Sequence, residues 1–284
     1  MRQTTVLSNF IHFVNTYSIW VAFGSLFSHL FFCKIYDVEP NYVIAFGLAI
    51  GVWVIYTLDH LLDGITLQNK AATRRHREHF FKRKGIIKIL VLAIFTLAVL
   101  AFWVPVEYYY AIGVLILLTM AHFIVNYLVP EPLKRSLFLK EIFVAVVVSL
   151  GIASTTLVGD FKTASRVSSF PFWIFLFINL SNIILFSIFD KEADEKSETL
   201  SLAGLYNDRI LRMVIYACLL ISAVLVILDY RSGVMEVSTL IVFGSMQVTL
   251  ALICLYPLYF RPNDRYRFYG DLIYVYPLTV LPFL

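Results

Sequence analysis

Long apolar runs separated by short polar segments dominate this chain. A membrane-spanning α-helix needs about 20 consecutive, mostly apolar residues, and nine stretches approach that length. We expect spanning helices at residues 9–33, 41–58, 86–104, 108–129, 139–158, 171–189, 210–228, 237–258 and 271–284. The stretch 171–189 has no charged residue, whereas the last stretch starts at Asp271 and contains Pro277. The pattern therefore predicts an all-α membrane protein built as a nine-helix bundle.

Lysine and arginine residues are divided unevenly between the two ends of these stretches. With nine spans, the N-terminus and every even-numbered loop share one side, which carries most of the 23 Lys and Arg residues. The opposite side carries only Lys34, Lys162, Arg166 and Arg231. Because cytoplasmic loops are enriched in Lys and Arg, we expect the N-terminus and the even-numbered loops to be cytoplasmic. In a bacterial cell the membrane would be the inner membrane.

Composition excludes several classes of protein. Of the 284 residues, 60% are hydrophobic and 15% charged, and the mean hydropathy is +0.80. A soluble domain has roughly 25% charged residues, so an ordinary soluble enzyme, a disordered chain and a disulfide scaffold do not fit. The net charge of +4 follows from the topology and does not indicate a nucleic-acid partner. We expect one integral-membrane domain over residues 1–284.

Two pairs of aspartates are the most distinctive polar motifs. Asp59 and Asp63 follow the second apolar stretch, and Asp190 and Asp194 follow the sixth, with Glu192 between them. A spacing of four places both carboxylates on one helix face, where they repel each other mildly. Proteins often hold Mg²⁺ with one or two carboxylates while a phosphate supplies further ligands. Because the pair recurs at the same predicted membrane face, the sequence favours a metal–phosphate site, although one pair alone equally fits a polar helix end.

Cationic side chains follow the first pair and open the fifth apolar stretch. Arg74 and Arg77 lie in the first group, and Lys134 and Arg135 in the second. Arginine binds phosphate oxygens in a bidentate manner and lysine acts as a point charge, so these four are candidate diphosphate ligands. Four other cations of the second loop are assigned to membrane topology: Arg75, Lys82, Arg83 and Lys84.

Some polar residues within or beside the apolar stretches are further candidates. Tyr56 lies one turn before the first acidic pair, and Asn182 lies on the sixth stretch above the second pair. Polar side chains inside a membrane face the protein interior, either as substrate ligands or as contacts between helices. We expect Asp271 to be an N-terminal acid of the last helix and Glu141 to extend to the membrane interface.

The combined pattern resembles the UbiA superfamily of intramembrane prenyltransferases. That family has nine transmembrane helices and two aspartate-rich cytoplasmic motifs, which follow helices two and six. The first family motif is similar to NDxxDxxxD, and Asp59 and Asp63 match its last two acids. Ile55 and Tyr56 stand in place of its leading Asn-Asp pair. The family also carries a Lys-Arg pair at the start of helix five, as at residues 134–135 here.

The second family motif is similar to DxxDxEGDxxxGxxTL. Asp190, Glu192 and Asp194 match its central DxEGD, whereas Ala193 replaces the glycine and Ser187 replaces the earlier acid. The closing Thr-Leu occurs two residues early, at residues 199–200, without the preceding glycine.

The resemblance implies a Mg²⁺-dependent transfer of an isoprenyl group from a prenyl diphosphate to a lipophilic or aromatic acceptor. The diphosphate would lie at the cytoplasmic mouth of a central cavity, with Mg²⁺ bridging it to the two acidic pairs. The same four aspartates would be both catalytic and metal-ligating, and membrane lipids would surround the bundle. Tyr56, Asn182 and Glu192 would line the substrate cavity.

Two alternatives stay open at this point. A terpene cyclase on the same scaffold would trap the allylic cation with a double bond of the substrate. A non-catalytic prenyl-lipid-binding protein would account for the acids missing from the motifs. A transporter fits less well, because the acids lie at one mouth and transporter sites favour the middle of the membrane. Acceptor identity, donor chain length and oligomeric state are not specified by these patterns.

Overall fold

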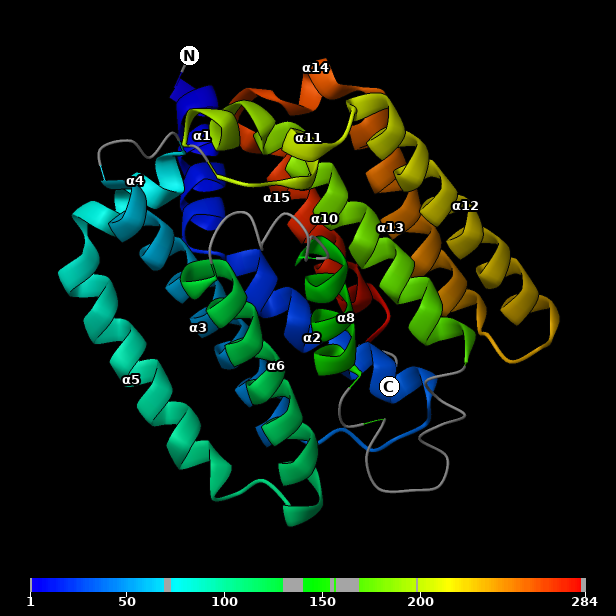
Figure 1. Ribbon diagram of the computed structural model, residues 1–284. Coiled ribbons are helices and arrows are strands. Elements are labelled where there is room, and N and C mark those ends of the chain that lie inside the picture. Colours follow the sequence, from blue (N-terminus) through cyan, green and yellow to red (C-terminus); the bar gives the residue numbers. More distant parts are fainter. Residues whose placement is uncertain are drawn as a thin grey trace.

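The computed structural model describes residues 2–68, 73–129, 140–153, 156, 169–197 and 199–281, and these ranges form helices and connecting segments without strands (Figure 1). The α-helices are α1 (Arg2–Thr16), α2 (Ile19–Ile35), α3 (Tyr42–Leu67), α4 (Arg74–Phe81), α5 (Arg83–Ala101), α6 (Tyr109–Leu128), α8 (Lys140–Ile152), α10 (Phe170–Lys196), α11 (Leu202–Leu205), α12 (Asp208–Arg231), α13 (Val237–Leu255), α14 (Pro257–Phe260) and α15 (Arg265–Leu272). Three 3₁₀ segments accompany them: η2 (Val106–Tyr108), η4 (Pro262–Asp264) and η5 (Ile273–Thr279).

Six helices are long and apolar enough to cross a membrane, namely α3, α5, α6 with η2, α10, α12 and α13. The pair α1–α2 makes a seventh span if it is counted as one, and it is bent by 69°. The helix bends at Ser18, because the φ of this residue is 52°, a left-handed backbone conformation that interrupts a right-handed helix. The predicted helical membrane fold is confirmed, whereas the described residues do not reach the predicted count of nine spans.

The predicted spans at 139–158 and 271–284 differ most from the structure. Within the described part of the first of these stretches, helix α8 covers 13 residues, fewer than a span needs. The last stretch is the end of α15 followed by the 3₁₀ segment η5, which contains Pro277. Proline has no N–H to donate and clashes with the preceding turn, so a regular α-helix does not continue through it.

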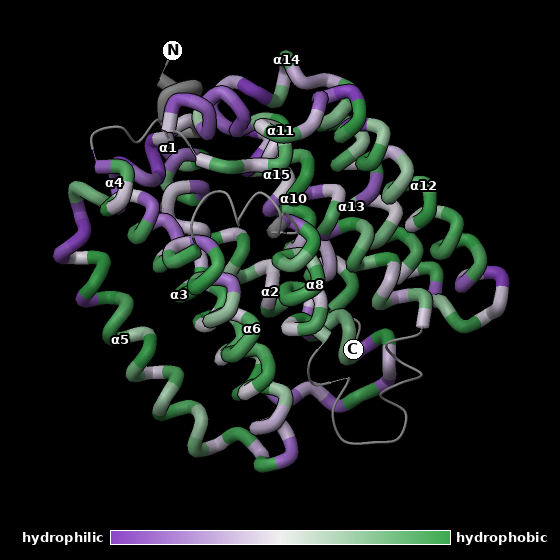
Figure 2. The backbone as a smooth tube through the Cα atoms, in the orientation of Figure 1, coloured by the Kyte–Doolittle hydropathy of each residue, from purple (hydrophilic) through white to green (hydrophobic). Residues whose placement is uncertain are grey.

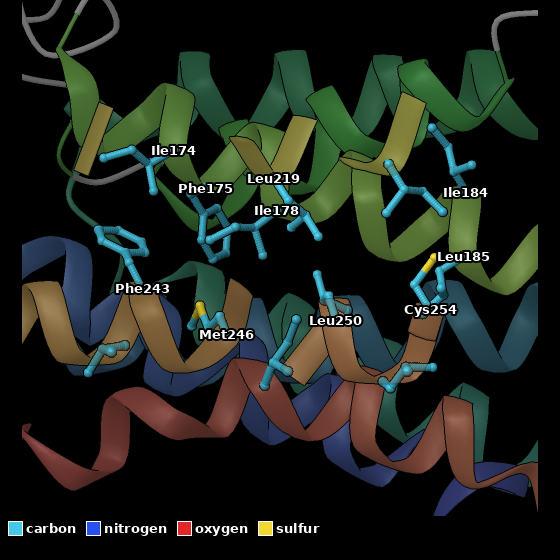
Figure 3. Packing of buried hydrophobic residues seen from close by; sticks show 14 of the residues in the cluster. Ile174, Phe175, Ile178, Ile184, Leu185, Leu219, Phe243, Met246, Leu250 and Cys254 are labelled. Carbon is cyan, nitrogen blue, oxygen red and sulfur yellow. The ribbon is translucent and has the colours of Figure 1, made fainter. Parts of the chain in front are cut away.

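Helix α10 lies at the centre of the bundle and contacts α8, α12 and α13. Phe243, Met246 and Leu250 of α13 lie across from Phe175 and Ile178 of α10, and all five are fully buried (Figure 3). Lipid tails are as apolar as these side chains, so close packing, and not removal from water, holds such helices together.

Hydrogen bonds between helices supplement this packing. The Asn179 side-chain N–H of α10 donates to the Ser149 hydroxyl of α8 over 2.7 Å. The Gln247 side-chain N–H of α13 donates to the Ser222 hydroxyl of α12 over 2.7 Å. These polar residues therefore connect neighbouring helices, which is one of the two roles that their position in the membrane predicts.

The lipid-facing and water-facing regions are separate. On α5, Ile89, Leu92 and Phe95 are more than half exposed, and on α6 so are Ile116 and Leu117. Apolar side chains exposed along a whole helix fit contact with lipid. Hydrophilic residues gather around α1, α4, α14 and α15 at one end of the bundle (Figure 2). We call this the polar end, and both acidic pairs lie near it.

Candidate active site

Helix α4 connects the two acidic motifs. It starts after Thr73, whose hydroxyl caps it by accepting from the His76 backbone N–H at 3.5 Å. Two consecutive residues of α4 then contact different motifs. Arg75 Nη2 lies 3.2 Å from Asp190 Oδ2 of α10, and His76 Nε2 lies 3.5 Å from Asp63 Oδ2 of α3. The ends of α3 and α10 therefore meet at one short helix.

The first acidic pair shares a hydroxyl donor. Tyr127 of α6 places its hydroxyl 3.0 Å from Asp59 Oδ1 and 2.8 Å from Asp63 Oδ1. One hydroxyl can reach both carboxylates because residues four apart lie on the same face of α3. This geometry agrees with the face that the spacing predicts.

Asp190 of the second pair is held by three donors. Arg75 of α4, Arg267 of α15 and the Tyr266 hydroxyl of α15 all donate to its carboxylate. The Asp190 side chain is 11% exposed, as is that of Arg267, and the Arg75 side chain is 15% exposed. Hydrogen bonds between ionised groups are roughly twice as strong as neutral ones, so this cluster fixes α4 and α15 against the end of α10.

The remaining acids of the second motif, Glu192 and Asp194, have partners of their own. Glu192 is 67% exposed and forms an ion pair with Arg261, with Oε1 and Nη1 2.5 Å apart. The Asp194 backbone carbonyl accepts from the Thr199 backbone N–H at 2.9 Å and from the Thr199 hydroxyl at 3.2 Å. Asp190, with a side chain that is 11% exposed, is therefore buried more deeply than Glu192.

A groove of about 580 Å³ opens beside Asp190, between α1, α4, the end of α10 and the segment from η4 to α15. We call it the cationic groove, because six Lys or Arg residues line it against three acids. The cations are Arg74, Arg75, Arg77, Lys196, Arg261 and Arg267, and the acids are Asp190, Glu192 and Asp264. A cleft with an excess of one charge concentrates ligands of the opposite sign, so this groove attracts anions.

Three histidine rings lie behind the groove. The His60 ring of α3 lies 5.7 Å from the His76 ring and 5.4 Å from the His79 ring of α4, between centroids. Burial, followed by the positive charge of Arg75, lowers the pKa of His76 to about 2. Burial also lowers the pKa of His79. His76 is therefore neutral at physiological pH, and the positive charge at this end comes from arginine and lysine.

The predicted site residues fall into three groups. Arg74 and Arg77 line the cationic groove, as do Asp190 and Glu192. The predicted diphosphate ligands Lys134 and Arg135 lie outside the described residues. The third group does not line the groove: Tyr56 and Asn182, which lie deeper along their helices, and the predicted metal ligands Asp59, Asp63 and Asp194.

The two deeper residues have different neighbours. The Tyr56 ring packs edge-on to the His60 ring, with centroids 6.4 Å apart. The Asn182 side-chain N–H donates to the Gly270 carbonyl and to the Tyr274 hydroxyl, each over 3.2 Å. Asn182 thus joins α10 to α15 and η5, and its predicted role in substrate binding remains a prediction.

Four residues of the site were not among the predicted ligands. Arg75 was assigned to topology, yet it contacts Asp190, and the partners Tyr127, Tyr266 and Arg267 carry no motif. A polar or cationic residue near the end of an apolar run is the only signal available for them. That signal is shared by many residues with no role in the site.

Two further expectations need correction. Asp271 lies in the last turn of α15, so it is not an N-terminal helix acid. Glu141 does not extend to the interface, because it is 7% exposed and its carboxylate accepts from the Leu202 backbone N–H of α11 at 3.1 Å. The sequence does not reveal either burial, because the covering segments come from distant parts of the chain.

The two motifs differ as possible metal sites. Within the described ranges, no three His, Cys, Asp or Glu side chains are arranged to hold a metal ion. Asp59 and Asp63 offer two carboxylates on one face, which fits Mg²⁺ bound by two carboxylates and the phosphates of a substrate. Asp190 instead accepts from two guanidinium groups. The residues present fit a cation at the first motif and an anion beside the second.

Comparison with known proteins gives one similar structure to report. No family model matches this chain, and no curated protein matches it in sequence. The apo structure of a UbiA homolog from Aeropyrum pernix K1 is similar, with a TM-score of 0.67. The similarity covers 93% of this chain and 98% of that chain at 10% sequence identity. The resemblance to the UbiA superfamily is therefore confirmed at the level of the fold: this chain is a multi-pass integral membrane protein with the fold of a UbiA homolog.

Proposed function

We propose that this protein is a Mg²⁺-dependent intramembrane prenyltransferase, which moves an isoprenyl group from a prenyl diphosphate to a lipophilic or aromatic acceptor. The observation that carries the proposal is the meeting of the two acidic motifs at α4. Asp63 and Asp190 contact adjacent residues of that helix, beside a groove rich in arginine. The fold shared with a UbiA homolog supports the same reading.

Each part of this end has a role in the transfer. Asp59 and Asp63 would hold Mg²⁺, and Asp190 would hold Arg75 and Arg267 beside it. When bound, Mg²⁺ neutralises charge on the diphosphate. Arg74 and Arg77 add fixed positive charge in the cationic groove, where negative charge develops as the C–O bond breaks. The diphosphate leaves with the bonding electron pair, and the acceptor donates a pair to the allylic cation and loses a proton.

Diphosphate release tests this proposal directly. Purified protein in lipid nanodiscs, given Mg²⁺, a labelled prenyl diphosphate and a panel of lipophilic aromatic acceptors, is expected to release diphosphate. Asp59→Asn and Asp190→Asn are expected to abolish that release. Asp208→Asn is a matched control, because Asp208 is 45% exposed and pairs with Lys191 over 2.8 Å outside the groove. Unchanged turnover in both motif variants would end the proposal.

Product analysis separates the alternatives. Omission of the acceptor is expected to prevent formation of a prenylated product. A cyclised hydrocarbon formed without an acceptor would indicate a terpene cyclase. Mg²⁺-dependent binding of the prenyl diphosphate without any turnover would indicate a non-catalytic lipid-binding protein.

A further inference from the structure

We propose that the second acidic motif of this protein carries arginine in place of metal. Arg75 and Arg267, held on Asp190, bind the diphosphate directly, while a divalent cation binds at Asp59 and Asp63 alone. The inference rests on the proposed function and specifies how the two motifs divide the recognition of one substrate headgroup.

The surroundings of Asp190 argue against a metal ion there. Its Oδ2 accepts from both Arg75 and Arg267, and its Oδ1 accepts from the Tyr266 hydroxyl. A Mg²⁺ ion needs carboxylate oxygens at about 2.0–2.1 Å. To bind Asp190 it would approach two guanidinium charges on the same oxygen and would have to displace them.

The same two arginines keep donors for another anion. A guanidinium group has five N–H donors, and Asp190 takes one from each arginine. The buried Nε of Arg267 has no hydrogen-bond partner within the part of the chain that the structure describes. Because arginine binds phosphate oxygens with two parallel N–H groups, these donors suit a diphosphate.

Packing fixes both arginines beside the groove. The Arg267 guanidinium lies 4.5 Å from the centroid of the Phe186 ring of α10. The Arg75 Nε donates to His76 Nε2 over 3.4 Å. Side chains held in this way lose little further freedom when they bind a ligand. Asp190 therefore acts as a positioning residue for both arginines.

The first motif is organised differently. Asp59 and Asp63 share the Tyr127 hydroxyl as a donor, and that donor is neutral, whereas the Asp190 carboxylate accepts from two guanidinium groups. The two motifs also lie close enough to serve one ligand, because His76 contacts Asp63 and the preceding residue, Arg75, contacts Asp190. One phosphate can then bind through the metal at the first motif while the other binds the arginines.

Binding of Mn²⁺ and inorganic pyrophosphate to the full chain in nanodiscs tests this division, because neither requires turnover. Mn²⁺ is counted by electron paramagnetic resonance, and pyrophosphate affinity is measured by calorimetry. We expect one Mn²⁺ per chain, at least a tenfold loss of Mn²⁺ affinity in Asp59→Asn, and a change below threefold in Asp190→Asn.

The arginine variants give the complementary result. Arg75→Gln and Arg267→Gln are expected to weaken pyrophosphate binding at least tenfold and to leave Mn²⁺ affinity without pyrophosphate unchanged. Arg265→Gln on the same helix is the matched control, because Arg265 does not line the cationic groove. If the buried Arg267→Gln variant fails to fold, the double variant Asp190→Asn/Arg267→Gln replaces it, because it removes one positive and one negative charge and leaves the net charge of the cluster unchanged. The double variant must also lose pyrophosphate affinity.

Two outcomes would overturn the inference. One is a second, spin-coupled Mn²⁺ that disappears in Asp190→Asn, and the other is equal pyrophosphate affinity in the arginine variants and the control. The proposed function would survive either outcome. The opposite combination is also possible: Mn²⁺ and pyrophosphate bind as expected, but the protein releases no diphosphate from a prenyl diphosphate. That combination would contradict the proposed function and support the division of the site.

Discussion

At the scale of single residues, the Tyr127 hydroxyl connects the two carboxylates of the first acidic pair. Its hydroxyl has one proton and lies within hydrogen-bond distance of two carboxylates, on Asp59 and Asp63. The proton can favour only one of them at a time, so the repulsion between the carboxylates is reduced and not removed. A cation that bound both carboxylates would compete with this hydroxyl for the same oxygens.

Tyr127→Phe tests that competition. Loss of a hydrogen bond to a charged group costs about 1.5–3 kcal/mol, so the metal-free variant is expected to melt at a lower temperature. Added Mg²⁺ is expected to raise its melting temperature more than that of the parent, because the ion no longer displaces a hydroxyl. Thermal unfolding with and without Mg²⁺ measures both effects.

A matched control is available for this variant. Tyr109→Phe removes a hydroxyl that donates to the Ala101 carbonyl over 2.9 Å, far from the acidic pair in the fold. It is expected to leave the Mg²⁺ response unchanged. The same Mg²⁺-induced rise in Tyr127→Phe and in the parent would contradict the proposed competition.

Asp271 is a second residue with a testable energetic role. It is 7% exposed, and no hydrogen bond or ion pair reaches its carboxylate from the described residues. A buried charge without such partners is destabilising, so Asp271→Asn is expected to raise the melting temperature. A gain of about 1 kcal/mol would correspond to roughly 2–4 °C. A fall in the melting temperature would show that the ionised carboxylate stabilises the fold.

At the scale of elements, the contact between α3 and α4 sets the geometry of the site. A Cβ atom on Gly64 of α3 would lie 2.6 Å from the His76 carbonyl oxygen and 3.2 Å from the Phe80 backbone nitrogen. Only glycine allows this close approach of the two backbones. The approach keeps Arg75 and His76 near the two acidic motifs.

Gly64→Ala is therefore expected to move α4 away from α3. Overpacking of this kind costs about 1–3 kcal/mol, and the displaced Arg75 should weaken pyrophosphate binding. Gly47→Ala on the same helix is the control, because nothing lies within 4 Å of the added Cβ there. Equal pyrophosphate affinity in the two variants would show that the α3–α4 contact does not set the site.

At the scale of the whole molecule, the polar end carries the two motifs and fixes a testable orientation. The native cysteines at 33, 218 and 254 are all buried, so introduced cysteines can report on each side. The Lys84→Cys variant, with its cysteine in the first turn of α5, is expected to react only with a membrane-impermeant thiol reagent on the cytoplasmic side. The Glu107→Cys variant, with its cysteine in η2 between α5 and α6, is expected to react only with the same reagent on the opposite side. The reverse labelling pattern would show that the polar end faces away from the cytoplasm, which would contradict the expected topology.

The elements themselves were largely predictable from the pattern of residues. A helix inside lipid must satisfy its own backbone hydrogen bonds, so a long apolar run specifies a spanning helix locally. The end of the chain was less predictable, because Pro277 and the 3₁₀ segment η5 interrupt an apolar run whose composition alone suggests a span. The spacing of Asp59 and Asp63 likewise fixed their shared face, since helical periodicity is a local property.

The partners of those acids depended on tertiary structure. Tyr127 lies 64 residues from Asp63, and Arg267 lies 77 residues from Asp190. Helical periodicity relates only positions close together in the chain, so it cannot predict these pairs. An arginine near the end of an apolar stretch also has the same sequence context whether it sets the membrane topology or forms an ion pair. By itself the sequence therefore determined the helices and the acidic faces, because those follow from short-range backbone geometry. Only the packing of the helices decided which cations and hydroxyls meet those faces.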